Sequence, residues 1–213
     1  MIKKYHILTH IAANRLIAII RGDSQEKTLQ TAVACIEGGF RTIEIAFTSP
    51  HANTCIEQLT TRYDNNPEIL IGAGTILEPV SARIAMLAGA KFIVSPSVDP
   101  ETAKICNLYQ IPYMAGCTTP TEAKVAMELG VDVIKLFPAK NLGKAVVQQY
   151  KGPFPQLNIM PTGGISLKNI NEWLATDIFA IGVGGQLTSP AKEGNYSQVV
   201  KNADQFVKKI QIC

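Results

Sequence analysis

The sequence predicts an α/β protein, a (β/α)8 TIM barrel with an extra N-terminal helix. Eight short runs rich in β-branched and other apolar residues alternate with helix-like stretches along the chain, which is typical of βα units with a parallel sheet. The ends of consecutive runs are 21 residues (Thr75 to Pro96) to 28 residues (Phe47 to Thr75) apart, which leaves room for one compact βα unit each time. The expected strands are residues 16–21, 42–47, 69–75, 92–96, 113–117, 133–138, 158–163 and 178–184.

The segments between these runs carry the signals of helix starts and stops. Asp23 or Ser24 precedes the first of them, and Asp99 and Thr119 each stand directly before a proline. Side-chain oxygens at such positions cap the free N–H groups of a first helical turn, and proline is tolerated there. Glycines such as Gly89 follow the helix-like stretches and indicate where a helix ends.

The length of 213 residues is close to the lower size limit of a (β/α)8 barrel. Residues 2–14, which precede the first expected strand, are expected to form the extra helix and to close the bottom of the barrel. A doubly wound open sheet is the alternative fold. No linker, low-complexity tract or change in composition interrupts the chain, so we expect a single domain over residues 1–213.

The composition excludes several classes of function. With 46% hydrophobic residues the chain can bury a core, and its net charge of +3 is too small and too evenly spread to indicate nucleic-acid or membrane partners. No apolar run reaches the ~18 residues of a membrane-spanning helix, and the first residues lack the apolar segment of a signal peptide. We therefore expect a cytoplasmic protein, for which a small anionic ligand remains compatible.

The cysteines and histidines indicate neither a metal site nor a disulfide framework. The five cysteines are odd in number and show no CxxC spacing, which fits reduced thiols. His6 and His10 share a face of the expected first helix, but no Glu stands between them and that helix lies at the wrong end of the barrel. We expect no metal in the site.

Two charged residues stand within otherwise apolar expected strands, where an unpaired buried charge is expensive. Lys135 lies in Val-Ile-Lys-Leu-Phe-Pro, and Glu44 lies in Thr-Ile-Glu-Ile-Ala-Phe. Burial disfavours the charged form of an amine, so Lys135 can supply a neutral nucleophile for a carbonyl, and a carboxylate across the barrel can transfer protons for it. The alternative is a purely structural salt bridge, which often fails to repay the desolvation of its two charges.

Glycine-rich segments end the seventh and eighth expected strands, at 161–165 and 182–185. Loops after these strands commonly bind phosphate in such barrels, because glycine lets backbone N–H groups approach an anion. Arg21 and Thr75 end the first and third expected strands and offer a guanidinium and a hydroxyl for a carboxylate. The alternative is that Arg21 is a surface residue paired with Asp23.

Short motifs along essentially the whole chain resemble those of one bacterial enzyme family. In this order they are similar to the 2-keto-3-deoxy-6-phosphogluconate (KDPG) aldolases, a family that includes the 4-hydroxy-2-oxoglutarate (KHG) aldolases. Each motif is short, but the set is specific. The motifs are Ala18–Arg21, Thr42–Ile45, Ile71–Thr75, Ile93–Pro96, Lys135–Pro138, Lys151–Phe154 and Pro161–Gly164.

The resemblance implies a class I aldolase, often a homotrimer, that needs no cofactor. Such an enzyme cleaves KDPG, a phosphorylated 2-keto acid, to pyruvate and glyceraldehyde 3-phosphate, and some members cleave KHG to pyruvate and glyoxylate. Lys135 matches the Schiff-base lysine of the family. Glu44 matches the general acid/base, which takes the proton of the C4 hydroxyl through a water.

The resemblance also implies which residues contact the substrate. Thr75 matches a contact to the pyruvate carboxylate, and the glycines after the seventh and eighth strands match the phosphate loops. Some members carry an Arg where this chain has Thr48, whereas others carry it at the end of the first strand, so Arg21 is expected to supply the cation. Gly185 stands where relatives have a Ser or another small residue nearby. The expected substrate-binding residues are Arg21, Thr75, Pro96, Phe137, Thr162, Gly163, Gly164, Gly184 and Gly185.

Three other hypotheses for the function stay open. One is an aldolase for 2-keto-3-deoxy-6-phosphogalactonate, which differs from KDPG only in its C4 configuration. Another is a barrel that binds a phosphorylated metabolite without chemistry, in which Glu44 and Lys135 form a structural pair. The third is a phosphate-binding isomerase in which the interior lysine acts as an acid.

Overall fold

Eight parallel strands form a barrel in the computed structural model, which describes residues 2–211. Hydrogen-bonded neighbours follow the order β7-β6-β5-β4-β3-β2-β1-β8, and a parallel bridge between Thr162 and Gly182 joins the two outermost strands. The predicted (β/α)8 fold is therefore confirmed. The strands are β1 (Leu16–Ile20), β2 (Thr42–Ala46), β3 (Leu70–Gly74), β4 (Ile93–Val94), β5 (Tyr113–Cys117), β6 (Val133–Leu136), β7 (Ile159–Pro161) and β8 (Ile181–Val183).

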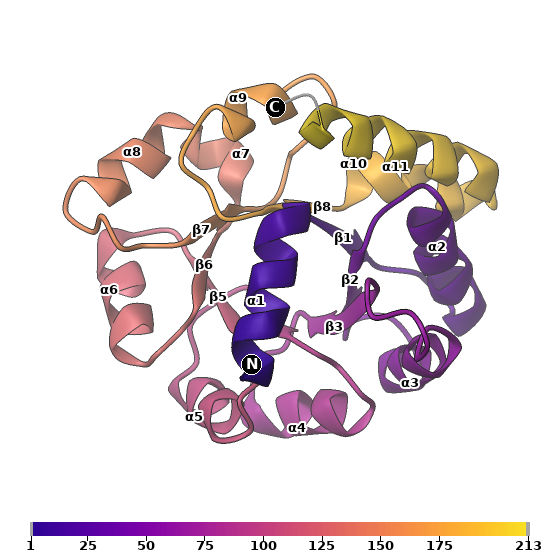
Figure 1. Ribbon diagram of the computed structural model, residues 1–213, viewed down its shortest axis with the longest axis horizontal. Helices are drawn as coiled ribbons and strands as arrows, with labels where there is room; N and C mark the ends of the chain where they lie inside the picture. Colours follow the sequence, from indigo (N-terminus) through magenta and orange to yellow (C-terminus); the bar gives the residue numbers. More distant parts are fainter. Residues whose placement is uncertain (1, 212–213) are drawn as a thin grey trace.

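Helices alternate with the strands and surround the barrel (Figure 1). The side chains of Ser24, Asp99 and Thr119 accept backbone N–H groups at the predicted helix starts. No helix within residues 2–211 combines the length and the apolar character needed to cross a membrane. The helices are α1 (Lys3–Asn14), α2 (Gln25–Glu37), α3 (Ala52–Arg62), α4 (Pro79–Leu87), α5 (Pro100–Leu108), α6 (Pro120–Glu128), α7 (Ala139–Leu142), α8 (Ala145–Lys151), α9 (Ile170–Leu174), α10 (Gly185–Thr188), the 3-10 helix η1 (Ser189–Glu193) and α11 (Tyr196–Gln211).

The predicted extra helix α1 lies across the end of the barrel at which the strands begin (Figure 1). It buries Ile7 and Ile11 against inward-facing side chains of the barrel, among them Ile17, Phe92 and Val133. Burial of apolar area stabilises this contact by about 25 cal/mol per Å². Because α1 fills this end, a ligand reaches the barrel interior from the end at which the strands finish.

Lys4 fixes α1 to the barrel through a largely buried polar contact. Its Nζ lies 3.0 Å from Asp132 Oδ1, just before β6, and donates to Asn107 Oδ1 in α5 at 3.2 Å. The second carboxylate oxygen of Asp132 accepts the backbone N–H of Tyr113 at 2.9 Å. One side chain of α1 is thereby tied to two neighbouring βα units.

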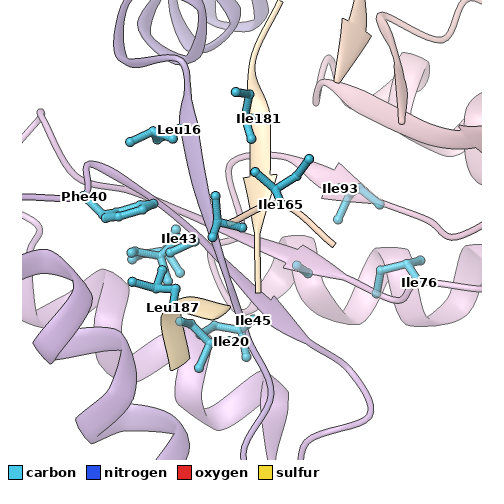
Figure 2. Packing of buried hydrophobic residues seen from close by; sticks show 14 of the residues in the cluster. Leu16, Ile20, Phe40, Ile43, Ile45, Ile76, Ile93, Ile165, Ile181 and Leu187 are labelled. Carbon is cyan, nitrogen blue, oxygen red and sulfur yellow. The ribbon is translucent and has the colours of Figure 1, made fainter. Parts of the chain in front are cut away.

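A second, larger apolar cluster fills the space between the strands and the outer helices. β1 and β2 contribute Leu16, Ile20, Ile43 and Ile45 to it, and Figure 2 shows Ile20 beside Ile45 of the neighbouring strand. Ile17 belongs instead to the inner cluster beneath α1. Successive side chains of a strand point to opposite faces, so each strand buries one set inside the barrel and one set against the helices.

Four cysteines of the described residues, Cys35, Cys55, Cys106 and Cys117, are buried free thiols. Burial raises the pKa of Cys106 and that of Cys117 to about 12, so both thiols stay protonated near neutral pH. The fifth, Cys213, lies outside the described residues.

We expect that Lys4→Met lowers the free energy of unfolding by about 2 kcal/mol, because it leaves the largely buried Asp132 carboxylate without its cation. Urea unfolding monitored by circular dichroism measures this change. Lys3→Met is the matched control, since Lys3 is exposed on the same turn of α1. Equal stabilities of the two variants would contradict an anchoring role for Lys4.

Candidate active site

The end of the barrel at which the strands finish gathers most of the predicted site residues. Glu44 and Lys135 lie within β2 and β6, as predicted. Arg21, Thr75 and Phe137 were placed in strands by the sequence pattern, but each directly follows the end of its strand. The strands are shorter than predicted because the chain turns away from the sheet at the rim, where Thr75 already has a φ of 56°.

Glu44 is fully buried in the barrel, and its two carboxylate oxygens have no hydrogen-bond partner within residues 2–211. The carboxylate lies over Gly74 of the neighbouring strand β3, where a Cβ atom would overlap Glu44 Oε1. Any larger residue at position 74 would therefore displace the carboxylate. Gly74 is a residue required by the site that the sequence patterns did not single out.

The environment of Glu44 favours its protonated form. Burial raises the pKa of this carboxyl, and the positive charges of Lys135 and Arg21 oppose part of that rise. A carboxyl with a raised pKa exchanges protons closer to neutral pH than an exposed one does, which is the property expected of a general acid/base.

Lys135 is buried in β6 between Gly116 of β5 and Met160 of β7. Its Nζ lies 5.3 Å from the centre of the Phe137 ring. The ion pairs within residues 2–211 do not include one between Lys135 and Glu44. The two groups therefore interact through charge across the barrel rather than through the direct salt bridge considered from the sequence.

Phe137, beside the lysine, is held by contacts from two neighbouring loops. Its carbonyl oxygen accepts the Thr118 hydroxyl at 2.8 Å, and the Tyr150 hydroxyl donates to the carbonyl of Thr118 at 2.5 Å. A Cβ atom on Gly163 would lie only 3.3 Å from the Phe137 ring. Thr118 and Tyr150 thus position the ring that faces the amine. The place of Thr118 directly after β5 marks it as a rim residue, whereas no pattern in the sequence points to Tyr150.

Arg21 points toward Thr75 across the rim of the barrel. Its Nη2 donates to Thr75 Oγ1 at 3.3 Å, and its positive charge contributes to the electrostatics of Glu44. Asp23, the other partner considered from the sequence, pairs instead with Lys27, at 3.0 Å. The left-handed backbone of Thr75 is uncommon for a threonine, and such strain often occurs at functional sites.

The loop after β7 contains Thr162, Gly163 and Gly164. The Thr162 hydroxyl is buried without a partner in the described chain and lies over Gly182, where a Cβ atom would overlap it. Gly163 and Gly164 have φ angles of 94° and 80°, which favour glycine, and Gly164 packs directly on the side chain of Lys140. The loop after β7 therefore contains a hydroxyl without a hydrogen-bond partner in the described chain and a backbone that is packed too closely for residues larger than glycine.

The loops after β8 and β4 hold the remaining predicted residues. Gly184 and Gly185 begin α10, and a Cβ atom added to Gly185 would meet open space. The backbone at Gly185 is therefore open to approach. Pro96 is half-buried after β4, with its carbonyl packed against Gly116, so it supports the rim near Lys135.

A cavity of about 440 Å³ opens beside this centre, between the start of α2 and the segment that contains α10 and η1. Its walls include Arg21, Lys27, Thr48, Gly185 and Lys192. The sequence patterns do not point to Lys27 or Lys192, because neither stands in a motif and the two are distant in sequence. Residues 2–211 contain no group of three or more His, Cys, Asp and Glu side chains placed to hold a metal ion.

Comparison with known proteins gives consistent matches over most of the chain. The 2-dehydro-3-deoxy-phosphogluconate aldolase of Haemophilus influenzae is 34% identical over 170 residues, 79% of either chain. The 2-dehydro-3-deoxy-6-phosphogalactonate aldolase of Escherichia coli is 29% identical over 194 residues, 91% of this chain and 93% of the relative.

A crystal structure of KDPG aldolase from Legionella pneumophila, with pyruvate captured as a covalent carbinolamine intermediate, has a TM-score of 0.84 and 29% sequence identity. The match covers 92% of this chain and 96% of that one. A family model described as KDPG and KHG aldolase matches residues 7–202. The chain therefore belongs to the KDPG and KHG aldolase family.

Proposed function

We propose that this protein is a class I aldolase that cleaves KDPG to pyruvate and glyceraldehyde 3-phosphate, and also KHG to pyruvate and glyoxylate. The observation that carries the proposal is the pairing of a buried lysine with a buried carboxylate inside the barrel, with no ion pair between them. Both groups remain available for chemistry, whereas a structural pair would neutralise itself.

In the first half of the reaction, the Lys135 amine attacks the C2 carbonyl carbon of the substrate. Loss of water from the carbinolamine leaves an iminium ion, which acts as an electron sink. The Glu44 carboxylate then takes the proton of the C4 hydroxyl through a water. The C3–C4 bond breaks, its electron pair moves into the iminium to form an enamine, and the aldehyde leaves.

In the second half, protonated Glu44 returns the proton to C3 of the enamine, and a water hydrolyses the resulting pyruvate imine. Lys135 and the carboxyl thereby return to their starting states. The raised pKa of Glu44 suits both steps, because the group must accept a proton and then give it up.

Substrate binding is assigned to the rim of the barrel. Arg21 and Thr75, joined by their hydrogen bond, face the substrate carboxylate, for which a guanidinium and a hydroxyl are suitable donors. Pro96, Phe137 and Thr162 line the centre, and the loops after β7 and β8, with Gly163, Gly164, Gly184 and Gly185, approach the phosphate end. This assignment is supported by their common position at the strand ends.

A second candidate function is cleavage of 2-keto-3-deoxy-6-phosphogalactonate. It is supported by the similarity to the Escherichia coli relative, which is named as an aldolase for this substrate. The two substrates differ only at C4, where Glu44 acts. Comparing kcat/KM for both substrates decides between the two candidates.

We also propose that the protein acts in the cytoplasm as a homotrimer. Support for a reducing compartment comes from the four buried free thiols. Support for self-association comes from an exposed apolar stripe formed by Val80, Ile84 and Leu87 of α4 and by Leu77 just before that helix. Exposed apolar patches of this kind commonly mark protein–protein contacts.

Incubation with pyruvate and borohydride is expected to add the mass of one reduced pyruvate to the native protein, because borohydride reduces the imine at Lys135. Lys135→Met, which fills a similar volume, should show no adduct in intact-mass spectrometry. Lys124→Met, at an exposed lysine of α6, is the matched control and should keep the adduct. If the folded native protein forms no adduct, the binding-only barrel or the isomerase becomes the better hypothesis.

The cleavage rate should fall as the pH falls through the raised pKa of Glu44, because the protonated carboxyl cannot accept the C4 hydroxyl proton. We expect Glu44→Gln to lower kcat/KM by about 10²- to 10⁴-fold and to remove this acidic limb. Glu44→Asp keeps an ionisable carboxyl group, so its kcat/KM should still fall at acidic pH. The measurement is the pH profile of kcat/KM, and an unchanged limb in Glu44→Gln would assign the proton transfer to another group.

Leu87→Glu is expected to convert the homotrimer into monomers, because it places a charge in the apolar stripe of α4. Sedimentation velocity at several protein concentrations measures the change. Asn171→Glu is the control, since it is exposed on α9 on the other side of the barrel (Figure 1). A monomeric native protein, or a trimeric Leu87→Glu variant, would refute this assignment.

A further inference from the structure

Thr75 lies at the barrel rim in a strained backbone conformation that its two neighbours hold in place. Its φ of 56° lies in the left-handed region, which a threonine rarely adopts. On one side, the carbonyl oxygen of Gly74 accepts the backbone N–H of Phe47 at 2.8 Å. On the other side, the N–H of Ile76 donates to the carbonyl oxygen of Val94 at 3.2 Å. The conformation of Thr75 therefore depends on anchors that lie outside Thr75 itself.

A further anchor acts on the carbonyl oxygen of Ile76, the residue that follows Thr75. This oxygen accepts the hydroxyl of Ser95 at 2.6 Å, and Ser95 is only 1% exposed. Ser95 directly follows β4, and its own N–H donates to the carbonyl oxygen of Met114 in β5 at 2.9 Å. Both backbone polar groups of Ile76 are thus bonded to the β4 segment, and one of the two bonds comes from a buried side chain.

Tyr113 of β5 completes a buried chain of hydrogen bonds. Its hydroxyl donates to Ser95 Oγ at 2.9 Å and lies 3.5 Å from the carbonyl oxygen of Ser97. Burial raises the pKa of Tyr113 to about 12, so this hydroxyl keeps its proton near neutral pH and remains a donor. Because Ser95 Oγ accepts from Tyr113, the Ser95 proton is left for the carbonyl oxygen of Ile76.

Ser95 and Tyr113 face the outer helices rather than the barrel interior. Along β4, Ile93 belongs to the outer apolar cluster and Val94 to the inner one, so strand alternation places Ser95 on the outer side. Tyr113 belongs to the outer cluster as well. Both side chains are shut off from the mouth, so any effect on a bound molecule must pass through the backbone to Thr75. Burying two hydroxyls among apolar side chains is costly unless they are bonded, and here they hold that backbone.

The other end of this chain of contacts is the Thr75 hydroxyl. Thr75 Oγ1 accepts Arg21 Nη2 at 3.3 Å, and in the proposed function both groups face the substrate carboxylate. Release of Thr75 into an ordinary right-handed or extended conformation would change the direction of its side chain. The hydroxyl would then turn away from Arg21.

We propose that Ser95, supported by Tyr113, is a positioning residue that holds Thr75 in its left-handed conformation and thereby directs the Thr75 hydroxyl toward the substrate carboxylate. The kinetic consequence of this inference rests on the proposed aldolase function. The conformational step depends only on the hydrogen bonds that link Tyr113, Ser95 and Ile76.

Ser95→Ala is expected to raise KM about fivefold for KDPG and for KHG alike, because both carry the same 2-keto carboxylate and one hydrogen bond contributes about that factor. The kcat should stay within about twofold, since the carboxylate is bound alike in the ground state and the transition state. Thr176→Ala is the matched control. It removes a hydroxyl bond of the same length, 2.6 Å, to the carbonyl oxygen of Trp173 just after α9, and it should change neither constant.

A lower kcat with unchanged KM in Ser95→Ala would indicate only a loss of folded enzyme and would overturn the proposal. Tyr113→Phe, which keeps the ring in the core, is the second variant and should raise both KM values about twofold. It decides the question if Ser95→Ala does not fold, and an unchanged KM in Tyr113→Phe would then count against the positioning role.

A double-mutant cycle with Thr75→Ala tests whether Ser95 acts through Thr75. Once the Thr75 hydroxyl is absent, its direction no longer matters, so adding Ser95→Ala should raise KM by less than about twofold. The small effect of Tyr113→Phe should likewise disappear in the Thr75→Ala background. A Ser95→Ala effect of undiminished size in that background would overturn the proposal, because Ser95 would then act by another route.

Crystal structures of the native protein and of Ser95→Ala test the conformational step without catalysis. The φ angle of Thr75 is expected to be positive in the native protein and to leave the left-handed region in the variant, with loss of the hydrogen bond to Arg21. An unchanged Thr75 in the variant overturns the positioning role even if the native protein forms the pyruvate adduct. Release of Thr75 in the variant, together with a native protein that forms no adduct, supports the positioning role and refutes the aldolase function.

Discussion

The rest of the site depends on the burial of one carboxylate inside the barrel without a direct partner. Removing Glu44 from water is costly, and the positive charges of Lys135 and Arg21, rather than hydrogen bonds from residues 2–211, offset part of that cost. The carboxylate also needs space, which Gly74 provides on the neighbouring strand. A closed barrel suits this arrangement, because two of its strands hold opposite charges at fixed separation with little water between them.

The two ends of the barrel differ in composition: one is filled with apolar side chains, and the other is lined by polar ones. At the end where the strands begin, α1 and the inner apolar cluster fill the interior, and the contact of Lys4 with Asp132 and Asn107 holds α1 there. At the other end the inward-facing residues become polar, and the strands stop early. The rim is thereby left free to carry groups such as Thr75, whose backbone is strained.

Charged side chains are found at three depths, from the barrel interior to the cavity beside its mouth. The Lys135 amine and the Glu44 carboxylate lie deepest, the Arg21 guanidinium lies at the rim, and Lys27 and Lys192 line the cavity beyond it. In the proposed binding mode, the substrate carboxylate lies near the Arg21 cation at the rim, and the keto and hydroxyl groups enter the barrel interior.

The order of βα units, the extra helix and the two charged residues inside the barrel are predictable from the sequence, because apolar periodicity and strand alternation are local properties. The rim residues are indicated by their place at the strand ends. Three features become visible in the folded chain alone: Glu44 and Lys135 form no ion pair, Arg21 turns to Thr75 and not to Asp23, and Gly74 makes room for a carboxylate. The distance between residues on different strands depends on how the eight strands close into a barrel, and this cannot be read from the sequence of any single segment. The cavity of Lys27 and Lys192 joins residues that are 165 positions apart, so only folding reveals it.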